Sequence, residues 1–255
     1  MNIIALIKQV PDTAQLSATV DGLKLMEDGS PRIVNPWDEY TLEAVIQLKE
    51  AHGGKVTLLT VGKAEATEAL KKGLAMGADE AVLISDPAFE NGDTLATARV
   101  LKTAIRKVGD YDLIVAGRSS IDGNNAAIAV QVAALMGGPI VAYVAELTVD
   151  PDAKTFSAVR LLEGGRESVV SALPAVVSVV KEINEPRYPS FIGIRKAAKA
   201  EIPTWGLSDL GLDGECVGAS GSHVVWTDVT LPPARETSLK MIEGSPADAA
   251  SELVD

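Results

Sequence analysis

Several residue types that commonly carry chemistry are scarce in this sequence of 255 residues. Its single cysteine, Cys216, cannot form a disulfide within the chain. Only His52 and His223 accompany it, so the sequence offers no Cys/His set for a zinc site, and we expect no metal centre. Neither histidine stands in a recognisable nucleophile or acid–base pattern. The composition therefore argues against an enzyme that works alone.

Long apolar runs, positive charge and aromatic rings are also in short supply. No run approaches the roughly 20 apolar residues of a membrane helix, so we expect no membrane insertion. The net charge of −12 lacks the basic footprint of a nucleic-acid binder. Aromatic residues make up only 4% of the chain, so a partner would have to supply most of any flavin pocket. Residues 1–8 lack a basic leader and a cleavage site, which predicts a first strand and a cytoplasmic protein.

The first two thirds of the chain alternate between two hydrophobic periods. Short runs rich in β-branched residues read as strands buried on both faces, at residues 3–7, 56–61, 81–84 and 113–116. Between them lie helical patterns, one ending at Gly53-Gly54 and another beginning after Asp93-Thr94. This alternation predicts an α/β fold with a mostly parallel, doubly wound sheet. Ligands of such sheets bind beyond the carboxyl ends of the strands.

Two regions depart from this alternation. Asp21-Gly22 and Asp28-Gly29 suggest a small hairpin, and residues 155–162, 166–172 and 175–180 read as further strands. After Ile183, prolines interrupt about 70 residues with little periodicity. We therefore expect an α/β nucleotide-binding domain at residues 1–183 and an arm at residues 184–255 that wraps a partner, ending in a short helix near residues 247–254. A partly disordered tail is the alternative, but five large apolar residues are costly to leave in water: Phe191, Ile192, Ile194, Trp205 and Trp226.

Three loops should meet at one edge of the predicted sheet, at residues 8–13, 35–39 and 116–125. The third joins a buried strand to a helix expected to begin near Ala126, and it consists largely of Gly, Ser, Asp and Asn. The start of a helix offers unpaired N–H groups and the positive end of the helix dipole, which suit a phosphate. Arg118 could add a charge-assisted contact, and Asp122 could hold a ribose or the loop itself. Since many strand-to-helix turns bind nothing, an ordinary turn is the alternative.

Familiar nucleotide motifs are absent from the sequence. There is no GxGxxG, no GxxxxGK[ST] and no Ser-Gly-Gly-x-Asp-Ser loop. A Rossmann dehydrogenase, a P-loop NTPase and an ATP pyrophosphatase are therefore disfavoured. What remains is a site that holds a nucleotide without obvious residues to react it.

Several segments, in this order and spacing, resemble the beta (small) subunit of electron-transfer flavoproteins from residue 1 to about residue 233. The segments are Val10-Pro11-Asp12-Thr13, Asn35-Pro36-Trp37-Asp38-Glu39, Ala75-Met76-Gly77-Ala78-Asp79, residues 117–125, Glu163-Gly164-Gly165, Leu173-Pro174-Ala175-Val176-Val177 and Asn184-Glu185-Pro186-Arg187-Tyr188-Pro189. The resemblance implies an adenine-nucleotide-hydrolase-like fold and a heterodimer with an alpha subunit that carries the redox-active FAD. It also implies acyl-CoA or other dehydrogenases as electron donors and a quinone reductase or another acceptor.

By the same resemblance, this subunit holds a structural AMP rather than a redox-active group. The implied AMP shell consists of Leu6, Asn35, Pro36, Trp37, Asp38, Val61, Gly117, Arg118, Ser119, Ser120, Ile121, Asp122, Gly123, Asn124, Asn125, Ala126, Ala127 and Ile128. The phosphate contacts of the family fall on the N–H groups of the last three. The family also has a loop whose apolar side chain plugs into partner dehydrogenases, and Phe191 occupies that position. Packing of Phe191 inside the chain or against the alpha subunit is the alternative.

Departures from the family pattern keep two other functions open. Ala126-Ala127-Ile128 replaces the Asn-Gln-Thr of many AMP-binding members, and Leu161 stands where many members have a glutamate. Asp122-Gly123 leans toward electron-bifurcating members, in which a second FAD replaces AMP and accepts hydride from NADH. The other alternative function is a free-standing nucleotide-binding stress-type protein, which the apolar arm disfavours.

Overall fold

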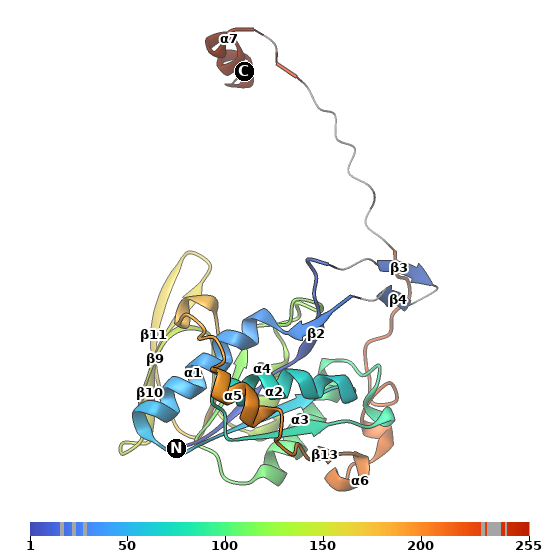
Figure 1. The fold of residues 1–255 in the computed structure, drawn as a ribbon, viewed down its shortest axis with the longest axis vertical. Helices are drawn as coiled ribbons and strands as arrows, with labels where there is room; N and C mark the ends of the chain where they lie inside the picture. Colours follow the sequence, from blue (N-terminus) through green and yellow to red (C-terminus); the bar gives the residue numbers. More distant parts are fainter. Residues whose placement is uncertain are drawn as a thin grey trace. The chain divides into compact units, whose positions relative to one another are not determined.

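The computed structural model describes residues 1–15, 18–21, 24–27, 30–230, 233, 241–242 and 244–254. Contacts divide the chain into a large unit, residues 1–17 with 27–225, and a small unit, residues 18–26 with 226–255. The large unit is built on a nine-stranded sheet in the order β11-β10-β9-β12-β8-β1-β6-β7-β13 (Figure 1). Its strands are β1 (Asn2–Leu6), β6 (Lys55–Val61), β7 (Glu80–Ile84), β8 (Leu113–Gly117), β9 (Ile140–Asp150), β10 (Thr155–Leu162), β11 (Gly165–Ala172), β12 (Ala175–Val179) and β13 (Thr204–Trp205).

The direction of the strands confirms the predicted fold class. Strand β1 pairs in parallel with β6 on one side and with β8 on the other, and β12 continues the parallel run to β9. Among the described pairings of this sheet, only β9–β10 and β10–β11 are antiparallel, so β10 is the strand that runs opposite to the others. The chain builds outward from β1 through β6 and β7, and then crosses back to β8. The carboxyl ends of β1 and β8 therefore form the topological switch point of a doubly wound sheet.

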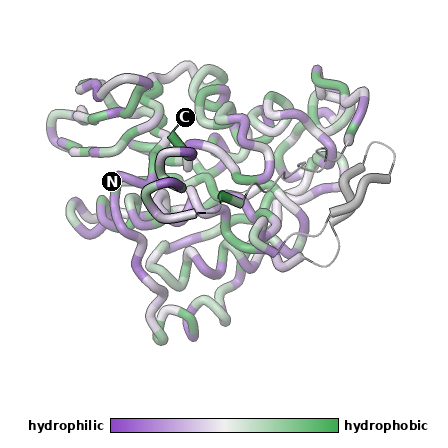
Figure 2. The backbone as a smooth tube through the Cα atoms, turned by 90° about the horizontal axis from the view of Figure 1, so that it is seen from above, coloured by the Kyte–Doolittle hydropathy of each residue, from purple (hydrophilic) through white to green (hydrophobic). Residues whose placement is uncertain are grey.

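Four helices cover the two faces of this sheet. Helices α1 (Pro36–His52) and α2 (Thr67–Met76) belong to one core cluster, and α3 (Thr94–Val108) and α4 (Ile128–Met136) belong to the other. Figure 2 shows that hydrophobic and hydrophilic stretches both occur along the backbone. Successive strand residues serve opposite clusters, since Leu113 and Val115 pack with α1 and α2 while Ile114 packs with α3 and α4. This is why the strands read as unbroken apolar runs.

The boundaries of α1 and α3 follow the predicted signals. Pro36 occupies the first turn of α1, and Gly53 ends that helix with a φ of 71°. The carboxylate of Asp93 accepts a hydrogen bond from the Ala96 N–H at the start of α3, as a capping residue does. Shorter elements complete the connections: the antiparallel pair β2 (Gln9–Pro11) and β5 (Arg32–Val34), and the 3₁₀ turns η1 (Ala64–Ala66) and η2 (Pro87–Phe89).

The chain beyond Ile183 contains more structure than its sequence pattern indicates. After the turn η3 (Lys181–Ile183) come α5 (Phe191–Ala197), strand β13, α6 (Leu207–Leu210) and the turn η4 (Gly214–Cys216). Strand β13 pairs with β7, and Leu210 and Val217 are buried in the core. Elements this short show no measurable hydrophobic period, so they could not be predicted from the sequence pattern. The domain boundary at residues 183/184 stays a prediction.

The small unit contains β3 (Ala18–Asp21), β4 (Lys24–Glu27) up to its last residue, and α7 (Pro246–Val254). The β3–β4 pair agrees with the predicted hairpin, although Gly22 and Asp28-Gly29 lie outside the described residues. Helix α7 confirms the predicted terminal helix. In the described part of the chain, no helix combines the length and apolarity that crossing a bilayer requires.

The centre of the sheet should dominate the stability of the large unit. Val115 is 0% exposed on β8, whereas Val170 is 72% exposed on the edge strand β11. Val115→Ala removes two buried carbon atoms and leaves a cavity, so it should lower the free energy of unfolding by about 2 kcal/mol. The matched control Val170→Ala should change it by less than about 0.5 kcal/mol. Urea denaturation of the two variants checks this, and equal midpoints would contradict the assignment of the core.

Candidate functional site

The three predicted loops come together at the switch point. The N–H of Lys8, after β1, donates to Asp38 Oδ2 at 2.7 Å, and the N–H of Asn35 donates to the Lys8 carbonyl at 2.8 Å. The loop after β8 joins them through the ion pair between Lys8 Nζ and Asp122 Oδ2 at 2.6 Å. Loops separated by up to 114 residues thus share one hydrogen-bonded edge.

Asn35 fixes the shape of the loop after β8. Its amide Nδ2 donates to the Ser119 carbonyl at 2.9 Å, and its Oδ1 accepts from the Ile121 N–H at 3.1 Å. The residue is only 1% exposed. Both ends of the amide are therefore engaged within the chain, which makes Asn35 a support for the loop rather than a free ligand contact.

Asp38 is a buried carboxylate at the start of α1. A Cβ atom on Gly117 would lie 2.4 Å from Asp38 Oδ1, so only glycine lets the end of β8 approach so closely. Burial raises the pKa of Asp38 to about 7, against the lowering effect of hydrogen bonds from the Lys8 backbone, the Asn35 side chain and the Gly117 backbone and of the charge of Lys8. Asp38 therefore joins the ends of β1 and β8 to the start of α1.

The rest of the loop after β8 is held by its own polar groups. Ser119 Oγ donates to Asn124 Oδ1 at 3.1 Å, and Asp122 Oδ1 accepts from the Gly123 N–H at 2.8 Å. Burial alone would raise the pKa of Asp122, but its hydrogen bonds and the charge of Lys8 outweigh burial and hold that pKa below its usual value. Asp122 thus supports the loop, which is one of the two roles that the sequence left open for it.

Helix α4 begins two residues later than its sequence indicates. Ala126 has a φ of 52°, outside the helical region, and the first residue of the helix is Ile128. No side chain caps this end, because the N-cap residue is Ala127. The first helical bond runs from the Gln131 N–H to the Ala127 carbonyl, so the amides just before it have no partner within the helix. The loop and the start of α4 could therefore serve as a backbone cradle for a phosphate.

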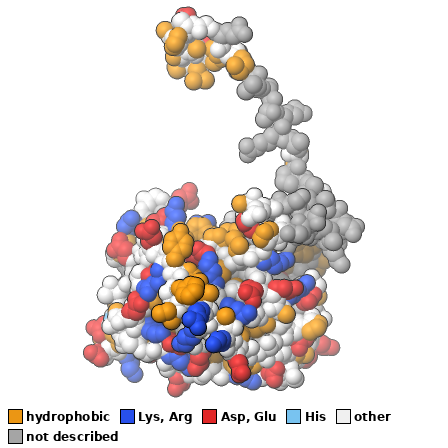
Figure 3. Space-filling view, in the orientation of Figure 1, with side chains coloured by type: hydrophobic (Ala, Val, Ile, Leu, Met, Phe, Trp, Pro, Cys, Tyr) orange, Lys and Arg blue, Asp and Glu red, His pale blue; other side chains and the backbone are white. Residues whose placement is uncertain are grey.

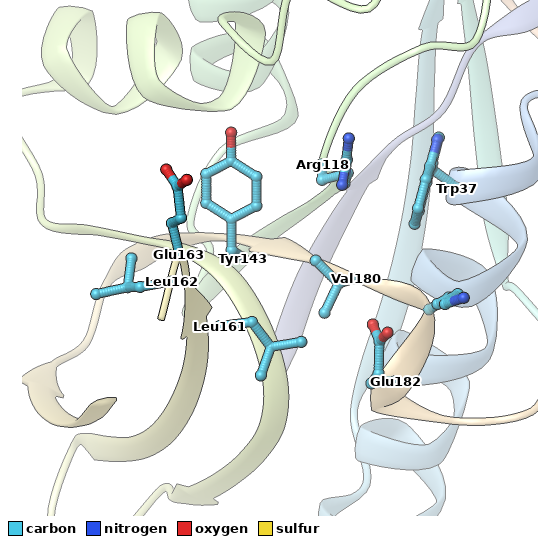
Figure 4. A pocket seen from close by; sticks show the side chains of 9 residues that line it. Trp37, Arg118, Tyr143, Leu161, Leu162, Glu163, Val180 and Glu182 are labelled. Atoms are coloured by element: carbon cyan, nitrogen blue, oxygen red, sulfur yellow. The ribbon is translucent and has the colours of Figure 1, made fainter. Parts of the chain in front are cut away.

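A pocket of about 460 Å³ adjoins this region (Figure 4). Arg118 lies between two rings, with its guanidinium carbon 4.6 Å from the centre of Trp37 and 6.0 Å from the centre of Tyr143. Its Nε is buried and has no hydrogen-bond partner among the described residues. The remaining lining residues are Leu161, Leu162, Glu163, Val180, Lys181 and Glu182.

Sequence reasoning missed Tyr143, Leu162, Glu163, Val180, Lys181 and Glu182 as residues of this pocket. Tyr143 has a φ of 63°, beside an irregularity in the pairing of β9 with β12, and its N–H donates to Ser178 Oγ at 3.2 Å. The irregularity turns its ring toward Arg118. No local pattern marks such a position, although tyrosine is rare in the chain, with four residues.

Of the remaining predicted residues, five lie at this edge of the sheet and Phe191 lies elsewhere. Leu6 and Val61 end the neighbouring strands β1 and β6, where Leu6 is buried and Val61 half-buried. Pro36 is the first residue of α1 at the same edge, and Ser120 and Asn125 belong to the loop after β8. Phe191 is not part of this site, since it lies on α5, which packs against α2. Its side chain is 76% exposed, so it does not pack inside this chain.

Helix α5 carries a second surface feature. Tyr188, Phe191, Ile192 and Ile194 are exposed, at 94%, 76%, 80% and 50%. Figure 3 shows hydrophobic side chains gathered over this helix with lysine and arginine side chains beside them. A cluster of exposed apolar side chains is typical of a surface that binds another molecule.

Asp38 should leave a measurable trace in the pH dependence of stability. Its folded pKa of about 7 exceeds its usual 3.8, so the folded state binds the proton more tightly and loses stability as the pH rises from about 4 to 7. Asp38→Asn removes this loss. Across that window, the free energy of unfolding of the variant should rise by up to about 4 kcal/mol relative to that of the unmodified chain. This value follows from a pKa difference of about 3 units at about 1.36 kcal/mol per unit.

Chemical denaturation at several pH values measures this difference. Glu39→Gln, which removes a half-buried carboxylate one residue along α1, is the control. Parallel stability curves for the unmodified chain and Asp38→Asn would contradict the raised pKa.

Comparisons with known proteins place the chain in a family. A family model described as "Electron transfer flavoprotein domain" matches residues 22–210. The chain is 39% identical to "Electron transfer flavoprotein subunit beta" of Thermoanaerobacterium thermosaccharolyticum, over 100% of this chain and 97% of the relative. It is 37% identical to "Protein FixA" of Azorhizobium caulinodans, over 98% and 92% of the two chains. It is 38% identical to "Caffeyl-CoA reductase-Etf complex subunit CarD" of Acetobacterium woodii, over 100% and 97%. The chain therefore belongs to the electron transfer flavoprotein beta-subunit family.

Proposed function

We propose that this chain is the AMP-binding subunit of a heterodimeric electron transfer flavoprotein. Its partner is an alpha subunit that carries FAD and shuttles electrons from dehydrogenases, often acyl-CoA dehydrogenases, to a quinone reductase or another acceptor. The observation that carries this proposal is the uncapped start of α4 at the switch point, behind a loop that Asn35 holds in place.

The cradle suits a nucleotide that is bound and not transformed. Backbone N–H groups at Ala127 and Ile128 would receive the phosphate, and their apolar side chains would take no part. The family's Asn-Gln-Thr supplies side-chain hydrogen bonds at this place, so binding here rests on the backbone. Around the cradle, Asn35, Asp38 and Asp122 all have partners within the chain. The residues of this chain would therefore bind and orient the nucleotide, and the flavin of the partner would supply the redox chemistry.

A second FAD in place of AMP is the second candidate. The pocket lined by Trp37, Arg118 and Tyr143 favours it, because it adjoins the loop through Arg118 and offers two aromatic side walls and a cation. One relative also takes its name from a caffeyl-CoA reductase complex. In that case this subunit would be an electron-bifurcating one, in which its own FAD accepts hydride from NADH.

A free-standing nucleotide-binding stress-type protein, the other alternative function, would be stable without a partner subunit. Val224, Val225 and Trp226 are 61%, 80% and 72% exposed, and leaving such groups in water is unfavourable. Their exposure supports a partner subunit at this part of the chain.

The nucleotide content of the purified heterodimer separates these functions. We would co-express the chain with its alpha subunit and quantify the nucleotides that acid releases. One FAD and one AMP per heterodimer would support the first proposal, and two FAD without AMP would support the second. A chain that purifies without a partner or a flavin would overturn both.

The cradle itself can be tested with a single charge. Ala127→Asp places a carboxylate at the start of α4, where it should repel the phosphate and lower the affinity for AMP by about tenfold, or about 1.4 kcal/mol. Ala127→Asn has nearly the same shape without the charge and should keep most of the affinity. Nucleotide analysis and AMP titration of both complexes measure this, and equal AMP content would show that the phosphate lies elsewhere.

Phe191 should anchor the redox partner. Phe191→Ala is expected to weaken docking of a dehydrogenase by about 2 kcal/mol, roughly 30-fold in Kd, without changing the nucleotide content. Val170→Ala, which truncates an exposed side chain on β11, is the control. Unchanged electron-transfer kinetics of Phe191→Ala with the physiological dehydrogenase would contradict this role.

A further inference from the structure

We propose that Arg187, held by Glu43 and Glu50 of α1, is the positioning residue of the docking segment, by which we mean residues 184–197. The inference rests on the proposed docking role of Phe191. It assigns to Arg187 the task of holding the segment in its binding shape before a partner arrives.

The guanidinium of Arg187 donates hydrogen bonds to two carboxylates, one on each side. Nε donates to Glu43 Oε2 at 2.8 Å and Nη2 donates to Glu43 Oε1 at 3.0 Å. The outer edge donates to Glu50, through Nη1 at 2.6 Å and Nη2 at 2.9 Å. The Arg187 N–H adds a bond to Glu43 Oε2 at 3.2 Å. These bonds engage every nitrogen of the guanidinium within the chain, so its role is internal rather than a contact with a partner's carboxylate.

The two glutamates differ in their surroundings. The Glu43 side chain is 4% exposed and also accepts a hydrogen bond from Gln47, whereas Glu50 lies at the surface. Burial by itself would raise the pKa of Glu43, but the hydrogen bonds and charge of Arg187 outweigh it and hold that pKa below its usual value. A bidentate pair with one buried partner is much stronger than an ordinary surface ion pair. Arg187 therefore fixes the segment to the middle of α1.

Other contacts hold the segment on either side of Arg187. Asn184 Nδ2 donates to the Tyr40 carbonyl at 3.0 Å, and Ser190 Oγ accepts from the Gly193 N–H at 3.0 Å. A Cβ on Gly193 would lie 2.1 Å from the Ala75 carbonyl oxygen, so α5 approaches the end of α2 as only glycine permits. The back of the segment is thereby fixed to α1 and α2.

The opposite side of the segment carries the exposed apolar groups. Tyr188 follows Arg187 directly, and Phe191 and Ile192 begin α5. Ordering a flexible loop on binding costs free energy, and a segment that is already ordered avoids that cost. Loss of the Arg187 contacts should therefore weaken docking even though Arg187 touches no partner.

The experiment uses the intact heterodimer and the variant Glu43→Gln, which acts at a buried position that no partner can reach. Arg187→Lys is the second variant, because it keeps the charge but loses the two-sided grip. Glu80→Gln, which removes the exposed ion pair of Lys55 and Glu80 at 2.9 Å, is the control. The measurements are hydrogen exchange of residues 188–197, the Kd for the dehydrogenase, the nucleotide content, and a double-mutant cycle with Phe191→Ala.

We expect Glu43→Gln and Arg187→Lys to speed exchange in residues 188–197 and to raise the Kd about tenfold, with nucleotide content unchanged. Phe191→Ala should cost less affinity in the Glu43→Gln background, because a loosened segment no longer presents the ring. Unchanged exchange, unchanged Kd or strictly additive effects would each overturn the positioning role. If Phe191→Ala itself leaves the Kd unchanged while exchange does respond to Glu43→Gln, it is the proposed docking function that fails.

Discussion

The site depends on one buried carboxylate. Asp38 stands at the first turn of α1, where it accepts the Lys8 N–H from the end of β1 and lies against Gly117 at the end of β8. A helix N-terminus stabilises a carboxylate, while burial works against its charge and raises its pKa to about 7. Because this one group touches two strands and a helix, it sets the position of every loop at the switch point. A side chain at position 117 would therefore displace Asp38 and, with it, the loops at this edge of the sheet.

Around Asp38, the polar side chains of the edge support the backbone rather than face outward. The amide of Asn35 donates to the Ser119 carbonyl and accepts from the Ile121 N–H, and Asp122 is paired with Lys8. The main-chain N–H groups at the uncapped start of α4 are available to an anion. Such a site tolerates alanine and isoleucine in place of polar residues, since backbone donors do not depend on side-chain identity. It suits a ligand that is held in place and does not react.

Helix α1 serves two surfaces at once. Its first turn contributes Trp37 to the pocket and Asp38 to the switch point, while Glu43 and Glu50 in later turns hold Arg187. Residues seven apart lie on the same side of a helix, so both glutamates can face one guanidinium. The candidate nucleotide region and the docking segment are thus built on a single rigid element. Both are presented from a packed scaffold, which favours precise positioning of each.

The sequence by itself determined the α/β class, the central strands, the main helices and the meeting of three loops at one edge. These features rest on local periods and caps, such as Pro36, Gly53 and Asp93, which short-range sterics and hydrogen bonding enforce. Tertiary structure decided the rest. Strand β13 has two residues and α5 has seven, too few for a period, and they form because β7 and α2 are there to pack against. Strand pairing brings Tyr143 close to Arg118. Asp38 is buried because Gly117, 79 residues later in the sequence, packs against it. Both features depend on contacts between distant segments, which no local sequence pattern records.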